Sequence, residues 1–128
     1  MLYIDTSALV KIVQIEAESQ ALRAYLETGR PLATSALSDV ELMRVVHRKG
    51  KQHVVQARAV LDRLPIVALS APILRAAGAL LPGTHLRTLD AIHLATAMTL
   101  PRLSCVCTYD LRMIDGAELL GLTCVSPT

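Results

Sequence analysis

The chain alternates short apolar segments with longer segments in which apolar residues recur every three or four positions. The short segments occupy residues 2–4, 32–34, 66–69, 105–108 and 122–125. Helical spacing is found in residues 8–13, 16–29, 37–50, 51–64, 71–81, 89–100 and 110–121. Short, almost continuously apolar strands alternating with helices are typical of a parallel sheet covered by helices on both faces. We therefore predict an α/β fold with five strands.

Length and composition limit the chain to one domain. Its 128 residues are 52% hydrophobic and only 19% charged, which favours a single folded domain spanning residues 1–128. Phe and Trp are absent, so the core must be aliphatic, and stacking platforms for single-stranded nucleic acid are scarce. A formal net charge of +2 excludes binding to phosphate backbones by bulk charge. Any contact with nucleic acid must come from local patches.

No targeting segment or disulfide framework is evident. An uncharged run long enough to span a membrane is missing, and Asp5 interrupts the N-terminus before a signal peptide could form. We expect a cytoplasmic protein. Cys105, Cys107 and Cys124 form no C-x-x-C pair, so buried free thiols are expected rather than disulfides or a zinc site.

Four acidic side chains are predicted to converge at one edge of the sheet. Asp5 follows the first strand and Asp110 follows the fourth, while Asp90 lies in the first turn of an apolar helix. Glu41 shares a helix face with apolar residues four positions away on either side. Because ligands of open parallel sheets gather at the carboxyl ends of the strands, these acids mark a candidate site.

Each acid also has a structural interpretation. Asp5, Asp90 and Asp110 occupy helix starts, where aspartate is a common cap. Ser38 and Glu41 fit the S-x-x-E capping box, in which Glu41 would bind the backbone instead of a ligand. Independent caps need not gather at one edge, however. Convergent carboxylates repel unless protonated or bound to a cation, and Mg²⁺ is a hard ion that accepts such ligands. This chemistry suits phosphodiester hydrolysis.

Four short motifs occur in a characteristic order along the whole chain. They are YIDTSAL at 3–9, TS at 34–35 with EL at 41–42, LRTLDAIHLATA at 86–97, and TYD at 108–110 with GL at 121–122. Together they resemble the PIN-domain ribonucleases, specifically the VapC toxins. The resemblance implies a three-layer fold with strand order 3-2-1-4-5, a Mg²⁺ or Mn²⁺ site, and cleavage of RNA. It also implies a homodimer and inhibition by a cognate VapB antitoxin.

The resemblance also suggests roles for individual residues. Asp5, Glu41, Asp90 and Asp110 stand at the four acidic positions of the family. Hydroxyl groups that orient carboxylates or water in the family correspond to Thr6 or Ser7, Ser35 and Thr108. Neither the RNA that is cleaved nor the number of metal ions follows from the sequence.

Several further polar residues have more than one interpretation. Arg87 and Arg112 flank the proposed site and could bind phosphate or form surface ion pairs. His93 could act as a general base, but a packed, hydrogen-bonded role is favoured. Asp115 is an outer metal ligand or a solvated helix residue. The basic stretch at 44–58 is either a solvated helical hairpin or an RNA-guiding patch.

Two other functions compete with a nuclease. A phosphatase-type hydrolase also has an Asp after its first strand, but Asp5-Thr6-Ser7 lacks a second acid and no Asp ends residues 66–69. The second alternative is a non-catalytic interaction or RNA-binding module.

For the antitoxin, we expect an apolar helix to cross the N-terminal helices and bring a basic residue to the acids. The apolar side chains behind this expectation are Leu9, Ile12, Val13, Leu22 and Leu26.

Overall fold

The computed structural model describes all residues from Met1 to Thr128. Five strands form one sheet in the order β3-β2-β1-β4-β5, and every neighbouring pair is parallel. Their bounds are β1 Leu2–Ile4, β2 Leu32–Ser35, β3 Ile66–Val67, β4 Cys105–Cys107 and β5 Cys124–Val125. The structure confirms the predicted number of strands, their direction and their order.

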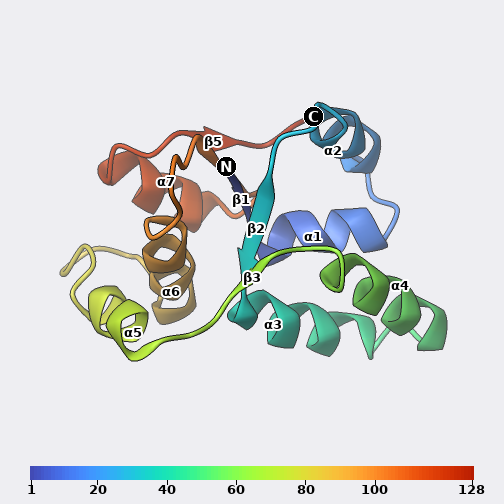
Figure 1. Ribbon diagram of the computed structural model, residues 1–128, viewed down its shortest axis with the longest axis horizontal. Helices are drawn as coiled ribbons and strands as arrows, with labels where there is room; N and C mark the ends of the chain where they lie inside the picture. The colour runs from blue at the N-terminus through green and yellow to red at the C-terminus, as the bar shows by residue number, and fades with distance from the viewer.

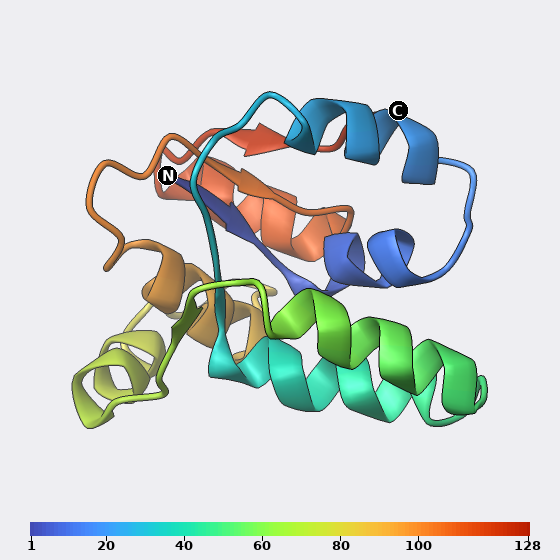
Figure 2. The ribbon, with the colours of Figure 1, turned by 45° about the vertical axis from the view of Figure 1, so that its right-hand side comes forward.

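Helices cover both faces of this sheet (Figure 1). One face carries α1 Thr6–Val13, α2 Ser19–Leu26, α3 Ala36–Val46 and α4 Lys51–Leu61. The other carries α5 Ala71–Gly78, α6 Thr88–Ala97 and α7 Leu111–Leu119. Figure 2 shows α3 and α4 running side by side as a hairpin below α1.

The central strand β1 supplies both cores, because successive side chains of a strand point to opposite faces. Leu2 and Ile4 belong to the main core, which α1 to α4 complete. Tyr3 lies on the other face, packed with Ala97 of α6 and Val106 of β4. Burial on both faces explains why this strand is apolar throughout. All three cysteines are free thiols; Cys105 and Cys107 are buried and Cys124 is half-buried.

Several element bounds differ from the prediction, and three of the differences have a visible local cause. The second helix starts at Ser19 instead of residue 16, because the Ser19 hydroxyl closes a turn by accepting from the Glu16 amide at 2.9 Å. β3 has two residues rather than four, since it is an edge strand and the chain turns away towards the Ser70 cap of α5. Arg87, not Thr88, is the N-cap of α6.

The apolar residues expected to receive an antitoxin helix are largely core. Leu9, Val13 and Leu22 are buried beneath the N-terminal helices, so that part of the expectation is wrong. Helical periodicity identifies an apolar face without showing whether the chain itself covers it. Ile12 and Leu26 are only partly buried. No helix is long and apolar enough to cross a membrane.

Candidate active site

The carboxyl ends of β1 and β4 bring Asp5 and Thr108 together. Ile4 is paired with Cys107 across these parallel strands, and the Asp5 amide donates to the Cys107 carbonyl at 3.2 Å. One residue further on, the Thr108 hydroxyl donates to Oδ2 of Asp5 at 2.7 Å. The predicted convergence of the two strand ends is therefore confirmed.

Asp5 is a buried carboxylate surrounded by donors. Its side chain caps α1 by accepting from the Ala8 amide at 3.1 Å, and Ser7 donates to the same oxygen at 2.7 Å. Only 3% of the residue is exposed. This burial raises the pKa of Asp5, although the hydrogen bonds from Ser7 and Thr108 oppose the rise. Capping and ligation are compatible here, because a carboxylate can accept about four hydrogen bonds or ligands.

Asp110 caps α7 and is linked to Asp5 through Thr108. Its Oδ1 accepts from the amides of Arg112 at 2.9 Å and Met113 at 3.4 Å. The Asp110 amide in turn donates to the Thr108 hydroxyl at 3.1 Å. Thr108 thus joins two of the predicted acids, while Oδ2 of Asp110 accepts no hydrogen bond.

Asp90 faces this pair from the first turn of α6. It is 7% exposed, and its only hydrogen bond is a long one of 3.4 Å from the Arg87 amide. Burial, and then the negative charge of Asp110, raises the pKa of Asp90. A buried carboxylate whose pKa is raised by a neighbouring carboxylate marks an electronegative site that a cation would relieve.

Glu41 reaches the site from the opposite helical layer. Its Oε1 accepts from Thr6 at 2.7 Å and pairs with Nε2 of His93 at 2.6 Å. Burial alone would raise the pKa of Glu41, but the hydrogen bonds with His93 and Thr6 hold it below its usual value.

The capping-box interpretation of Glu41 is wrong. The N-cap of α3 is Ser35, whose hydroxyl accepts from the Leu37 amide at 3.0 Å. Ser38 lies inside the helix and is buried, where its hydroxyl accepts from Thr34 at 2.7 Å. Because the helix begins three residues earlier than the capping box requires, Glu41 is left free to face the site.

His93 is a packed, hydrogen-bonded residue, as the sequence favoured. The residue is 3% exposed, and its Nδ1 lies 2.6 Å from the hydroxyl of Tyr3. Tyr3 is the site residue that sequence reasoning missed. A tyrosine in a short apolar strand looks like ordinary core, and no local signal shows that its hydroxyl meets a histidine 90 residues away.

The oxygen atoms that remain free suit a hard divalent ion. Oε2 of Glu41, Oδ1 of Asp90 and Oδ2 of Asp110 accept no hydrogen bond, so each is available as a ligand. No three His, Cys, Asp or Glu side chains are already gathered as a ready-made metal cluster. Mg²⁺ tolerates this arrangement, since it usually keeps several waters and binds one or two carboxylates directly.

Of the predicted hydroxyl residues, Thr6, Ser7 and Thr108 contact acids but Ser35 does not. The Ser35 hydroxyl instead caps α3, the helix that carries Glu41, by accepting from the Leu37 amide. Ser35 therefore supports the surroundings of the site rather than a carboxylate.

Two other polar residues lie outside the acid cluster. Asp115 is exposed on α7, five residues after Asp110 and therefore about 140° around the helix from it. It lines a small cleft of about 270 Å³ together with Arg112, Thr84 and His85. The structure gives no support to Asp115 as an outer ligand.

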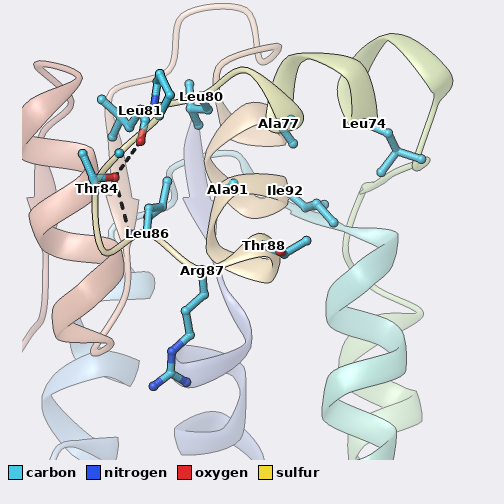
Figure 3. A pocket seen from close by; sticks show the side chains of 13 residues that line it. Leu74, Ala77, Leu80, Leu81, Thr84, Leu86, Arg87, Thr88, Ala91 and Ile92 are labelled. Carbon is cyan, nitrogen blue, oxygen red and sulfur yellow. Dashed lines mark hydrogen bonds between the residues drawn. The ribbon is translucent and has the colours of Figure 1, made fainter.

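Arg87 lies between the acids and a separate cleft. This cleft, of about 390 Å³, lies between α5, α6 and the loop that joins them, and none of the four acids lines it. Figure 3 shows the Arg87 side chain at its edge, pointing away from the other lining residues. The guanidinium helps to lower the pKa of Asp90, against the larger effects of burial and Asp110.

The basic stretch at 44–58 forms the end of α3 and most of α4. Arg58 makes a two-pronged ion pair with Asp39, at 2.9 and 3.1 Å. Arg44, His47, Arg48, Lys49 and Lys51 are exposed on this hairpin. The hairpin itself is confirmed, and guidance of RNA by its exposed side chains stays a prediction.

Sequence comparison identifies the family of this chain. Residues 2–119 match the model of the PIN domain. Ribonuclease VapC46 of Mycobacterium tuberculosis (strain H37Rv) is 45% identical over 128 residues, which cover 99% of this chain and 98% of the relative. Ribonuclease VapC47 of the strain CDC 1551 is 44% identical over 133 residues, with 99% and 97% covered. The chain therefore belongs to the PIN-domain family, and its relatives are VapC proteins.

Solved structures show the same fold. A toxin–antitoxin complex from Klebsiella pneumoniae contains a chain that superposes with a TM-score of 0.78 at 26% identity, covering 100% of this chain and 98% of that one. Mycobacterium tuberculosis VapC20, described as a sarcin-ricin loop cleaving toxin, also has a TM-score of 0.78, at 17% identity with 99% and 100% covered. The second likeness concerns the fold alone.

Proposed function

We propose that this protein is a VapC-type endoribonuclease toxin that hydrolyses RNA phosphodiester bonds with Mg²⁺ or Mn²⁺ held by Asp5, Glu41, Asp90 and Asp110. The observation that carries the proposal is the link from Asp5 through the Thr108 hydroxyl to Asp110, with Asp90 close enough for the charge of Asp110 to raise its pKa. A family match over nearly the whole chain and relatives named as ribonucleases support it.

Donors of the protein hold two of the proposed metal-binding carboxylates in place. Ser7, Thr108 and the Ala8 amide fix the Asp5 carboxylate, while Thr6 and His93 fix that of Glu41. A divalent ion, when bound, would supply a bound water of lowered pKa and would offset the charge of the leaving oxygen. Such a water needs no separate protein base. This agrees with His93, which is buried and hydrogen-bonded through both ring nitrogens.

Arg87 is the side chain best placed to hold the substrate phosphate. It is exposed, and its guanidinium is close enough to the site to influence Asp90. Arginine suits this role because its planar group can bind two phosphate oxygens at once. Arg112 contributes its backbone amide to Asp110, and its side chain lines the neighbouring cleft.

A VapB-type antitoxin is the proposed inhibitor, and a homodimer the proposed assembly. The Klebsiella relative was solved as a toxin–antitoxin complex, which supports the first of these. On this chain, an open groove of about 630 Å³ lies between the end of α1 and α4, lined by Ile12, Ile15 and Val60 among others. Ile15 is 93% exposed, so a helix that covered this groove would remove more apolar surface from water at Ile15 than at Ile12 or Val60.

The test is cleavage of a mixed RNA substrate by purified protein with EDTA, Mg²⁺ or Mn²⁺. Wild type should cleave only with metal, and Asp5→Asn, Asp90→Asn and Asp110→Asn should each lose that activity while keeping the wild-type circular dichroism spectrum. Glu41→Gln should also be folded and inactive. Asp62→Asn, an exposed substitution at the end of α4, is the matched control.

The outcomes separate the proposal from its rivals. Near wild-type cleavage by two of the three Asp variants would overturn the ligand assignment. RNA binding without cleavage, unaffected by EDTA, would indicate a non-catalytic module. Hydrolysis of phosphomonoesters but not RNA would indicate a phosphatase.

A further inference from the structure

A continuous row of hydrogen bonds runs from the centre of the sheet to Glu41. The Tyr3 hydroxyl lies 2.6 Å from Nδ1 of His93, and Nε2 of the same ring lies 2.6 Å from Oε1 of Glu41. Tyr3 and His93 are 0% and 3% exposed, so water does not compete for these contacts. The phenol and imidazole rings meet edge to face, with centroids 6.0 Å apart.

The donors and acceptors in this row fix the direction of the hydrogen bond to Glu41. The ionised Glu41 carboxylate can only accept, so Nε2 of His93 carries the proton that faces it. At the other side of the ring, Nδ1 and the Tyr3 hydroxyl share one hydrogen bond. The imidazole ring is therefore held at both nitrogens.

Glu41 needs a contact that holds its carboxylate in place, because it lacks the backbone amides that hold the other three acids. The other three acids sit at helix starts, where backbone amides hold their carboxylates. Glu41 lies in the middle of α3 on a longer, more flexible side chain and has no such amide. His93 comes from α6, on the opposite face of the sheet, and ties Glu41 across to the layer that carries Asp90.

We propose that Tyr3 and His93 are positioning residues that hold Glu41 with its Oε2 directed to the metal. This inference rests on the proposed metal-dependent nuclease function. His93 orients the carboxylate, and the Tyr3 hydroxyl fixes the ring that does so. Neither residue touches the RNA or the metal. Residues that orient metal ligands in this way commonly change metal affinity or activity by about 10–100-fold when removed.

The experiment compares matched variants by Mn²⁺ affinity from titration calorimetry and by kcat for RNA cleavage. Tyr3→Phe removes one hydroxyl, and Tyr25→Phe, a tyrosine of α2 far from the acids, is its control. His93→Leu fills the space with an apolar side chain that has no donor. His93→Gln can still present an amide donor at the position of Nε2.

Tyr3→Phe and His93→Leu should weaken Mn²⁺ binding and lower kcat by about 10-fold or more, and His93→Gln should recover most of the loss. Tyr25→Phe should stay within about twofold of wild type by the same measurements, since its hydroxyl contacts Cys105 and Arg30 instead of His93. A merely space-filling His93 would give Leu and Gln variants that behave alike. Long-range ¹H–¹⁵N spectra of wild type should show the His93 ring protonated on Nε2, without any substitution.

Several results would overturn the inference. Mn²⁺ affinity and kcat unchanged in Tyr3→Phe, equal defects in both His93 variants, or a His93 ring protonated only on Nδ1 would each do so while the nuclease function stands. A wild-type protein that neither binds Mn²⁺ nor cleaves RNA would overturn the proposed function and this inference together. If His93→Leu fails to fold, the Mn²⁺ affinity and kcat of Tyr3→Phe and the wild-type spectra still test whether Tyr3 and His93 position Glu41.

Discussion

Removing the charge of Asp90 should stabilise the metal-free protein. Asp90→Asn relieves two unfavourable effects at once, the burial of a charge and its repulsion by Asp110, which are the two main causes of the raised pKa. Asn keeps the size of Asp, and its side-chain oxygen can still accept from the Arg87 amide. The cost is a weaker interaction with the N-terminus of α6.

The size of the gain follows from the electrostatics. Two unit charges about 4 Å apart repel by at most about 4 kcal/mol at an effective dielectric constant near 20. Solvent and salt at the open side of the site reduce this to about 1 kcal/mol. A gain of about 1 kcal/mol corresponds to a rise in Tm of about 4 °C for a domain of this size.

The stabilisation by Asp90→Asn should depend on pH. Asp90 has a raised pKa in the folded state, so the unfolded chain, with a value near 3.9, releases its proton first as the pH rises. The metal-free protein therefore loses stability as the pH rises above about 4, and the penalty is complete above the raised pKa. The advantage of Asp90→Asn should be full at neutral pH and absent below about pH 4, where both states are protonated.

Thermal melts of both proteins in EDTA and in Mg²⁺, from pH 4 to 8, would measure this directly. Wild type should gain stability with Mg²⁺, by about 2.7 kcal/mol at 100 times the dissociation constant, and the variant should gain much less. Asp115→Asn, an exposed site on α7 that changes net charge equally, is the control. An Asp90→Asn protein less stable than wild type in EDTA at neutral pH would refute the reasoning.

Two further predictions concern the surface and the backbone. Binding of a VapB-type antitoxin should add hydrogen-exchange protection to residues 8–26, because Ile12 and the 93%-exposed Ile15 line an open groove; unchanged protection there would count against that docking site. Gly121 follows α7 with a φ of +73°, so Gly121→Ala should lower the free energy of unfolding by about 1 kcal/mol. Gly78→Ala should raise it by about 0.5 kcal/mol. Nothing approaches a Cβ at either position, so urea unfolding of the two variants isolates the backbone effect, and equal shifts would contradict it.

Local patterns sufficed to predict the elements and the part of the site that the strands carry. Asp5 and Asp110 follow strands that are parallel neighbours, and each caps the helix that comes next. For these acids, the position in the local sequence determines the position in the site. The same reasoning placed Asp90 in the first turn of α6, where it is buried.

The role of Glu41 could not be predicted in this way. Ser35 and Ser38 are both acceptable N-caps, and the choice between them decides whether Glu41 binds the backbone or faces the site. Long-range contacts make that choice, because Ser35 pairs with Val67 of β3 and the Thr34 hydroxyl, which contacts Ser38, donates to the Ile4 carbonyl of β1. The row from Tyr3 through His93 to Glu41 is equally non-local.

The four acids divide into two kinds, and this division says where a cation is needed. Asp5 and Glu41 are held by several donors each, which fix the positions of their carboxylates. Asp90 and Asp110 have only backbone amides at helix starts, and burial together with the charge of Asp110 raises the pKa of Asp90. Donor-rich carboxylates can keep a fixed geometry without metal, while a cation is needed to offset the repulsion between Asp90 and Asp110. Loss of Asp90 or Asp110 should therefore change metal-linked stability most, and loss of the donors around Asp5 and Glu41 should change geometry.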